Sequence, residues 1–431
     1  MSVSRLVARR QLYDDMAEEG LGFSFTAVTG YAATTITTAD PRFMFGGAAA
    51  SAERYRGGYI YRRLRAVGEQ IRMANSLTNT SSLATLTHFG PDWSTLTDTD
   101  AEMVAMDPDE LHRIFEDALD ELMAPCPVLL AHGPADWDMQ ASTTGEWDAG
   151  LTNATFAAQT TSSEVFRGAR SKVLTLTGAA GYTEADSLVR FGQGQQGSAY
   201  AIVKADIGTG IFRILDQGGN TVESVSFTQE QWLLIKKHFT LGADDEGARI
   251  RILGTDNLDA IDVQMAGVVR RNEPFFYMPS WYTDKMNLKG VSRIASAVAG
   301  RETDTSLAGS IQWESLSEGT DYQKVSAQAD ANPFGVQILN TALMNEPLFL
   351  MIECPYSAPY GVAAPFTAET DETDCPLDLL LAQVKILLGG RYPKKYPTLK
   401  AIGAAEKVAA LKEQTVPLPP RRSGFGRAFR A

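Results

Sequence analysis

Cysteine and histidine are scarce in this chain. Its 431 residues include three cysteines and four histidines, and both kinds are scattered. Cys126, Cys354 and Cys375 show neither CxxC spacing nor the density of a disulfide framework. The histidines show no zinc-ligand spacing either. We therefore expect no metal site and no disulfide scaffold. Each cysteine adjoins a proline and is predicted to be buried or to lie in a turn.

Long apolar runs and an excess of basic residues are also missing. No run of about 18 apolar residues occurs, and the N-terminal stretch lacks the apolar core of a signal peptide. These features predict a protein that folds in a cytoplasm and does not enter a membrane. The formal net charge is −13, which argues against a protein that coats nucleic acid over its whole surface.

Motifs that carry catalysis are absent as well. The sequence has no phosphate-binding loop, no G-x-S-x-G and no H-E-x-x-H. A Ser–His–Asp triad or a pair of glycosidase carboxylates is compatible with the residue types present, but nothing points to either. The loop "GADDEG" at 242–247 lacks the spacing of an EF-hand and is predicted to be a solvated turn rather than a calcium site. We expect a chain that is not an enzyme and uses no cofactor.

One glycine pattern resembles a cofactor motif. Gly192, Gly194 and Gly197 spell G-x-G-x-x-G after the strand-like residues 188–191. A dinucleotide site requires a helix after these glycines. Here residues 198–206 alternate in the manner of a strand. The pattern therefore predicts a loop between antiparallel strands, in which the glycines tolerate positive φ.

Hydrophobic patterning predicts an α+β multidomain protein. Residues 1–150 are expected to form a mixed domain with an N-terminal helix and a strand meander. Residues 151–272 show eight or so short strands and turn signals, which predict an inserted antiparallel β-sandwich of the jelly-roll type. Residues 273–415 are mixed α/β and are expected to pack with 1–150, and 416–431 form a basic flexible tail. An insertion of this kind predicts that Gly150 and Asn272 lie close together.

Helix signals are clear at four places. A short amphipathic helix opens the chain, and another follows at 108–123, where Asp107 is a suitable N-cap and Pro108 suits the first helical position. The segment 376–388 predicts a third helix, stopped by Gly389 and Gly390. The segment 397–412 predicts a fourth.

Two blocks of opposite charge lie close in sequence. The first, between residues 54 and 72, interleaves tyrosines with arginines, a mixture that can grip nucleic acid. Its arginines proposed to contact DNA or another subunit are Arg54, Arg56, Arg62, Arg63 and Arg65. The second, between 92 and 121, contains eleven acidic residues and one basic residue. Charge complementarity between neighbouring copies of the chain and two solvated faces are both compatible with this pattern.

The Pro- and Gly-rich C-terminal tail is basic and contains no acidic residue. It is predicted to be extended or disordered alone and to order on a neighbouring protein. The arginines proposed to dock this tail are Arg421, Arg422, Arg427 and Arg430.

The segment from "RYRGGYIYRRLRAVGEQIRMANSL" through "SLATLTHFGPDW" to "MDPDELHRIFEDALDEL" resembles structural proteins of tailed-bacteriophage virions, of the head–tail junction and tail. The middle part, with "FGQGQQGSAYAIVKADIGTGIFRILD" and "HFTLGADDEGARIRILGTDNLDAIDVQMAGVVRRNE", resembles the carbohydrate-binding-module-like jelly rolls inserted into such proteins. The resemblance covers about residues 50–270.

This resemblance implies a non-enzymatic virion protein, made in the host cytoplasm and located at the head–tail junction or in the tail. The expected role is a head–tail adaptor (connector or neck) that forms a ring, commonly twelvefold, between the portal and the tail. Its expected partners are further copies of itself, the portal protein and tail, nozzle or fibre proteins. DNA would pass through the ring with only non-specific contact, which an acidic wall favours.

The alternative is a component of a tail fibre, tail spike or baseplate that binds host glycans through the sandwich. Sugar sites stack rings on exposed aromatic side chains. The candidate contacts in the sandwich are Trp232, Tyr200 and Tyr182, although strand spacing also allows all three to be core residues.

Overall fold

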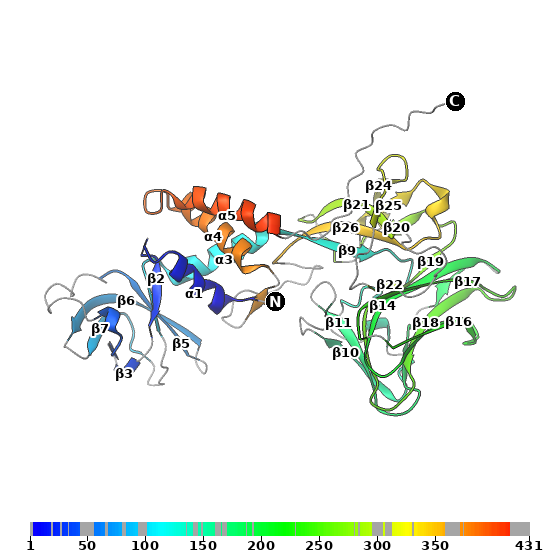
Figure 1. Ribbon diagram of the computed structural model, residues 1–431, viewed down its shortest axis with the longest axis horizontal. Helices are drawn as coiled ribbons and strands as arrows, with labels where there is room; N and C mark the ends of the chain where they lie inside the picture. The colour runs from blue at the N-terminus through cyan, green and yellow to red at the C-terminus, as the bar shows by residue number, and fades with distance from the viewer. Residues whose placement is uncertain are drawn as a thin grey trace. The chain divides into compact units, whose positions relative to one another are not determined.

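The chain forms two compact units in the computed structural model (Figure 1), and the second unit interrupts the first in sequence. The first unit comprises Met1–Leu122 and Pro365–Gln414, and the second comprises Met123–Ala364 and Thr415–Ala431. The structure describes residues 3–18, 20–25, 28–32, 34–43, 56–64, 68–79, 83–93, 101–134, 136–140, 145–147, 150–159, 165, 170–186, 188–191, 194–228, 230–279, 281–282, 285–294, 305–306, 313–329, 332–357, 371–373 and 375–413. Within these ranges, no helix has the length and apolar character needed to cross a membrane.

The first unit contains a seven-stranded antiparallel sheet in the order β2-β8-β5-β6-β7-β4-β3. Its strands are β2 (Gly22–Phe25), β3 (Val28–Ala32), β4 (Thr35–Thr38), β5 (Tyr59–Leu64), β6 (Gly68–Asn79), β7 (Ala84–Phe89) and β8 (Ala101–Val104). The consecutive strands β5, β6 and β7 pair as a meander. Alternate residues such as Ala84 and Leu86 of β7 are buried, as the period of two in the sequence predicts. A short separate pairing joins β1 (Val3–Ser4) to β27 (Glu372–Thr373).

All four predicted helices are present in the first unit. They are α1 (Arg5–Asp15), α3 (Pro108–Glu121), α4 (Leu377–Arg391) and α5 (Leu399–Glu413). The Asp107 side chain caps α3 by accepting a hydrogen bond from the Asp109 N–H at 3.0 Å, and Pro108 occupies the first turn. Figure 1 shows α4 and α5 side by side.

The predicted stop of α4 at Gly389 and Gly390 is wrong, because the helix continues through both glycines to Arg391. A Cβ at Gly389 would lie 2.4 Å from the backbone nitrogen of Lys400. Gly403 of α5 makes a matching approach, with its Cβ position 2.6 Å from the Ala382 carbonyl oxygen. The glycines therefore allow the two helices to cross closely rather than ending one of them.

The middle of the second unit is an antiparallel β-sandwich, as the sequence predicts. The first sheet has the order β10-β11-β19-β14-β17-β22 and the second has the order β12-β18-β15-β16, with β13 also paired to β18. The strands are β10 (Ala154–Gln159), β11 (Ser171–Leu176), β12 (Tyr182–Glu184), β13 (Val189–Arg190), β14 (Gln196–Ile207), β15 (Gly210–Leu215), β16 (Thr221–Phe227), β17 (Leu233–Thr240), β18 (Gly247–Gly254), β19 (Ala260–Arg270) and β22 (Thr305–Ser306). A core that includes Phe212, Ile250 and Val263 fills the space between the sheets.

Two further sheets complete the second unit. One has the order β23-β21-β26-β9 and the other β20-β25-β24. Their strands are β9 (Met123–Leu129), β20 (Phe275–Tyr277), β21 (Asn287–Ile294), β23 (Trp313–Ser315), β24 (Tyr322–Ala329), β25 (Asn332–Ile338) and β26 (Leu348–Pro355). A second core joins their residues, such as Leu350, to Tyr200, Ile202 and Met265 of the six-stranded sheet. That sheet is therefore buried on both faces.

Strand β9 escaped the sequence-based prediction because Pro125 and Pro127 interrupt its pattern. It lies at the edge of its sheet, where a strand tolerates prolines because one side needs no N–H donors. Cys126 of β9 is buried, as are the other two cysteines, which agrees with the prediction for them.

The boundaries of the parts differ from those expected. Residues from 123 onward belong to the second unit rather than the first, because β9 pairs with β26. The segment between the sandwich and residue 364 also belongs to the second unit. The expected closeness of Gly150 and Asn272 is wrong. Gly150 precedes β10, which begins at the same end of the sheet as Ala260 of β19, with β11 between the two strands, whereas Asn272 follows the opposite end of β19. The rise of a strand separates the two ends of β19 by roughly 33 Å.

The chain instead enters the sandwich at His132. The His132 N–H donates to the Val268 carbonyl at 2.8 Å, and the His132 Nδ1 accepts from the Arg270 N–H at 3.0 Å. The segment before the sandwich and the segment after it are therefore joined next to the end of β19. An insertion point exists, about 18 residues earlier than the sequence pattern indicates.

The G-x-G-x-x-G segment follows strand β13 and runs into strand β14, which starts at Gln196, so a strand rather than a helix follows the glycines, as predicted. The two strands belong to different sheets, so the predicted loop between antiparallel partners is wrong in that respect. Gly194 has a φ of +65°, the conformation for which glycine is suited. Gly197 has another role, because a Cβ there would lie 2.7 Å from both Phe191 and Phe239. Gly192 lies outside the described residues. The "GADDEG" turn is closed by Asp245, whose carboxylate accepts from the Gly242 N–H at 3.1 Å.

Candidate functional site

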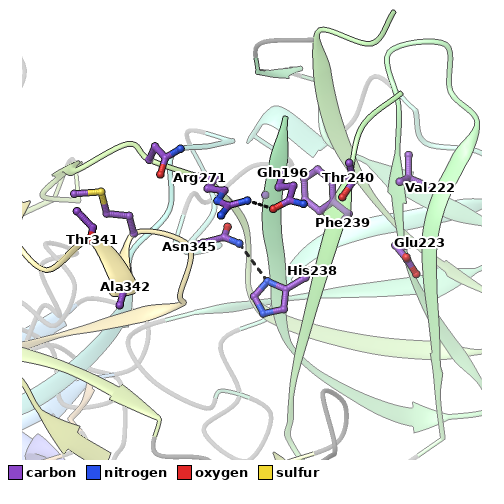
Figure 2. A pocket seen from close by; sticks show the side chains of 13 residues that line it. Gln196, Val222, Glu223, His238, Phe239, Thr240, Arg271, Thr341, Ala342 and Asn345 are labelled. Atoms are coloured by element: carbon purple, nitrogen blue, oxygen red, sulfur yellow. Dashed lines mark hydrogen bonds between the residues drawn. The ribbon is translucent and has the colours of Figure 1, made fainter. Parts of the chain in front are cut away.

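A polar cleft of about 800 Å³ opens at one end of the sandwich in the second unit (Figure 2). The residues that line it come from the starts or ends of sandwich strands and from the turn before β26. They are Gln196, Gly197, Val222, Glu223, His238, Phe239, Thr240, Arg271, Asn272, Thr341, Ala342, Met344 and Asn345. The cleft is therefore built from segments that are distant in sequence.

The pairing of β14 with β17 sets one wall of the cleft. In this register Gln196 faces Thr240, and Ser198 faces His238. Phe239 points to the other side, into the sandwich core. Alternation along β17 therefore directs His238 and Thr240 away from the core and toward the turn that contains Asn345.

Hydrogen bonds fix the turn against this wall. The Ser198 Oγ lies 2.7 Å from the main-chain oxygen of Asn345 and 2.7 Å from His238 Nδ1. The Asn345 side-chain amide approaches the same imidazole nitrogen at 3.5 Å. Lys236 pairs with Glu346 at the next position of the turn. The floor of the cleft is thus a preorganised polar cluster.

Two charged side chains border the cleft. Arg271 is exposed and donates to the side-chain oxygen of Gln196, and Figure 2 shows these two side chains pointing toward each other. Glu223 lies 3.5 Å from the ammonium group of Lys237. The guanidinium group has five N–H donors, so its hydrogen bond with Gln196 leaves capacity for a further acceptor.

The cleft offers hydrogen-bonding groups rather than an evident nucleophile. Ser198 is fully buried, and its hydroxyl is hydrogen-bonded to the His238 imidazole and to the Asn345 carbonyl oxygen. Of the described residues that line the cleft, Glu223 is the one carboxylate. Within the described ranges, no group of three or more His, Cys, Asp or Glu side chains is placed to hold a metal ion.

The predicted arginine block is only partly described. Arg56 is exposed in the turn before β5. Arg62 and Arg63 lie in β5 opposite Gln70 and Glu69, and the structure describes their backbone alone. Arg54 and Arg65 lie outside the described residues. A contact of this block with DNA or with another subunit stays a prediction.

Several members of the acidic block have partners within the first unit. Arg391 of α4 pairs with Glu110 at 3.3 Å and also with Asp117. The Gln383 amide donates to Glu121 at 2.6 Å. Arg391 neutralises part of the negative charge of the block, and Gln383 adds a hydrogen bond. Neither contact requires a neighbouring copy of the chain.

The predicted docking arginines of the tail, Arg421, Arg422, Arg427 and Arg430, lie outside the described residues.

The three candidate glycan contacts lie in different environments. Tyr200 is fully buried in the second core, so the prediction that it contacts a glycan is wrong. Trp232 is partly buried against the same core, with the Lys204 ammonium 5.8 Å from the centre of its ring. Tyr182 is half-buried, and the Arg251 guanidinium lies 4.2 Å from its ring centre. None of the three lines the cleft.

Sequence reasoning missed the cleft residues, among them His238, Arg271 and Asn345. No local motif marks them, because the cleft depends on strand register and on the turn before β26. It also missed Phe275 and Tyr277, for which a signal existed. They alternate around Phe276 in a short aromatic run, and both are exposed.

No protein-family model matches the sequence, and no curated protein does either. Solved structures with some similarity include the enzymatically active domain of tailspike protein 4 of bacteriophage CBA120, at 16% identity and a TM-score of 0.27. The similarity covers 32% of this chain and 22% of the tailspike domain. This chain thus spans about a fifth of that relative.

Two carbohydrate-binding modules are also similar. Family 16 Carbohydrate Binding Module-2 has 12% identity and a TM-score of 0.25, over 31% of this chain and 99% of the module. TmCBM61, solved with β-1,4-galactotriose, has 14% identity and a TM-score of 0.25, over 32% of this chain and 96% of the module. Similarity at this level carries no argument about what this chain binds.

Proposed function

We propose that this chain is a non-enzymatic component of a tailed-phage virion that binds a host-surface glycan through the cleft of its second unit. The observation that carries the proposal is the cleft lining. It combines three amide side chains, two threonine hydroxyls and an imidazole with one arginine and one glutamate. A sugar presents many hydroxyls that both donate and accept hydrogen bonds, and amides, hydroxyls and imidazoles match both roles.

The phage setting rests on the sequence resemblance described above. The order of the sandwich strands supports the jelly-roll part of that resemblance. Within the larger sheets, β11-β19-β14-β17 face β12-β18-β15-β16, which is the eight-stranded, two-sheet arrangement of a jelly roll. Lectin domains and capsid proteins share this architecture.

The number of carboxylates in the cleft favours a binding role over hydrolysis. Most glycosidases use two carboxyl groups, about 5 to 9.5 Å apart, on either side of the scissile bond. Among the residues that the structure describes, the lining contains one carboxylate, Glu223, and Lys237 lies beside it. The buried Ser198 is also unsuited to attack a substrate.

The head–tail adaptor has less support than the glycan-binding role. Its sequence argument used charge complementarity between copies, and Arg391 and Gln383 already contact Glu110, Asp117 and Glu121 within the unit. Negative-stain images of the chain mixed with its portal protein separate the two roles. Twelvefold rings on the portal would favour the adaptor, and trimers that do not attach to the portal would favour a spike or fibre that binds the host.

Affinity electrophoresis of the full chain in gels that contain xylan, mixed-linkage β-glucan, galactan, dextran or alginate tests the glycan proposal. We expect at least one polysaccharide to retard the chain, with a Kd of roughly micromolar order. Replacement Arg271→Ala should weaken that binding at least about tenfold, the scale of one hydrogen bond to a charged group.

Arg190→Ala is the matched control, because Arg190 is an exposed arginine of the same unit that does not line the cleft. It should bind as the wild type does. No retardation of the wild type, together with no binding to purified bacterial surface polysaccharides on an array, would reject the proposed function.

A further inference from the structure

Strand β20 presents two aromatic side chains to solvent. Phe275 is 43% exposed and Tyr277 is 59% exposed, whereas Phe276 between them is 1% exposed. Residues two apart in a strand share a face and lie about 7 Å apart along it. Phe275 and Tyr277 therefore form one exposed aromatic pair, called here the aromatic platform.

Strand β25, which pairs with β20, and strand β24 beyond it place amides in line with this platform. Phe275 faces Gln337 of β25, which in turn faces Gln323 of β24. The Gln323 amide donates to the Gln337 side-chain oxygen at 2.5 Å. Tyr277 faces Gly335, which adds no side chain and leaves the surface beside the tyrosine open.

Firm anchoring holds β20 in place. The His132 Nε2 hydrogen-bonds to the Phe275 carbonyl oxygen at 3.0 Å. The His132 ring stacks on Phe276, with ring centres 4.3 Å apart. The two exposed rings therefore sit on a strand that binding does not have to order, which lowers the entropic cost of binding.

The platform continues from the cleft along two chain segments. Arg271 and Asn272 line the cleft, and β20 begins three residues later. On the partner segment Gln337 lies beside the platform, and Thr341 lines the cleft. The Ile338 N–H donates to the Pro274 carbonyl at 2.8 Å, which ties the segments together between the two places.

We propose that the aromatic platform stacks sugar rings of an extended polysaccharide whose neighbouring residues occupy the cleft. This inference rests on the proposed glycan-binding function and adds that the site recognises a chain of several sugars. The apolar face of a sugar ring packs on an aromatic ring, and the Gln323 and Gln337 amides are placed to bond its hydroxyls.

The size of the platform favours this ligand over a protein. The two rings together expose roughly the area of one aromatic side chain, about 200 Å². A stable protein interface buries about 800 Å² on each partner. A flat, narrow ligand that continues into the cleft fits the platform better.

Chain length is the variable that tests this inference. For the polysaccharide that most retards the wild type, calorimetry compares binding of its disaccharide and its hexasaccharide to the full chain. We expect the hexasaccharide to bind at least about tenfold more tightly. The double variant Phe275→Ala/Tyr277→Ala should lose that advantage and bind the disaccharide as the wild type does.

Two further variants serve as controls for the double variant. Phe275→Trp keeps an aromatic ring and should retain hexasaccharide binding. Phe89→Ala removes a ring of the first unit that is 51% exposed, and it should change nothing. Equal binding of the hexasaccharide by the double variant and the wild type would overturn the inference and leave the cleft proposal intact. Failure of the wild type to bind any polysaccharide would reject both.

Discussion

A buried ion pair of the first unit and the cleft of the second unit use polar groups differently. In the first unit, Arg9 and Glu102 are 1% and 3% exposed and form a two-pronged ion pair with hydrogen bonds of 2.7 and 2.8 Å. In the cleft of the second unit, Arg271 is exposed and bonds to Gln196, a neutral side chain. The buried pair joins α1 to β8 within the first unit, and the cleft leaves polar groups where a ligand can reach them.

The largest expected effect tests the first half of this comparison. Replacement Glu102→Ala leaves Arg9 buried without its carboxylate and also removes the acceptor of the Tyr13 hydroxyl. Breaking one partner of a buried pair typically costs about 3–5 kcal/mol of the free energy of unfolding. Calorimetry should show the transition of the first unit at a clearly lower temperature.

The double variant Arg9→Met/Glu102→Leu is the control for this prediction. It removes both charges and should destabilise the unit less than Glu102→Ala does, because no charge is left unpaired. A single variant as stable as the wild type would show that the buried pair does not hold the first unit together.

Local patterns predicted many elements of both units because they report local physics. Alternation along β14 and β17 identifies strands, and the Asp107–Pro108 pair identifies the start of α3. Other features depend on tertiary contacts. The edge position that permits Pro125 and Pro127 in β9 is not a local property.

Charge and aromatic patterns are ambiguous for the same reason. Arg391 and Asp117 are 274 residues apart, so no local pattern pairs them. Tyr200 and Tyr277 both occur in aromatic or apolar strand patterns, yet one is fully buried and the other is 59% exposed. The difference arises because the six-stranded sheet is covered on both faces, while β20 lies at the edge of its sheet.

A pH titration sharpens the comparison, because the surroundings of His132 and Asp138 in the second unit shift the pKa of both groups. Burial, with a contribution from Arg270, lowers the pKa of His132 to about 3 from 6.5. Between these values the unfolded state binds the extra proton. The stabilising contribution of neutral His132 is therefore present above pH 6.5 and is lost as the pH falls toward about 3.

Asp138 acts in the opposite direction. Burial raises the pKa of Asp138 to about 6 from 3.8, against the effect of its hydrogen bond from Trp281. Between these values the folded state binds the extra proton, so this contribution to stability decreases as the pH rises. We expect Asp138→Asn to unmask the His132 slope, which approaches about 1.4 kcal/mol per pH unit. Urea unfolding midpoints between about pH 4 and 6 measure it, and equal slopes in wild type and variant would refute it.

The smallest expected effect concerns the close crossing of α4 and α5. In Gly389→Ala the new Cβ would lie 2.4 Å from the Lys400 backbone nitrogen, so the helices must move apart, at a cost of about 1–3 kcal/mol. Gly390→Ala is the adjacent control, since a Cβ there meets nothing within 4 Å. It should stabilise the helix by up to about 1 kcal/mol. Thermal unfolding of the two variants measures the contrast. Equal stability would mean that close packing of α4 on α5 is not required.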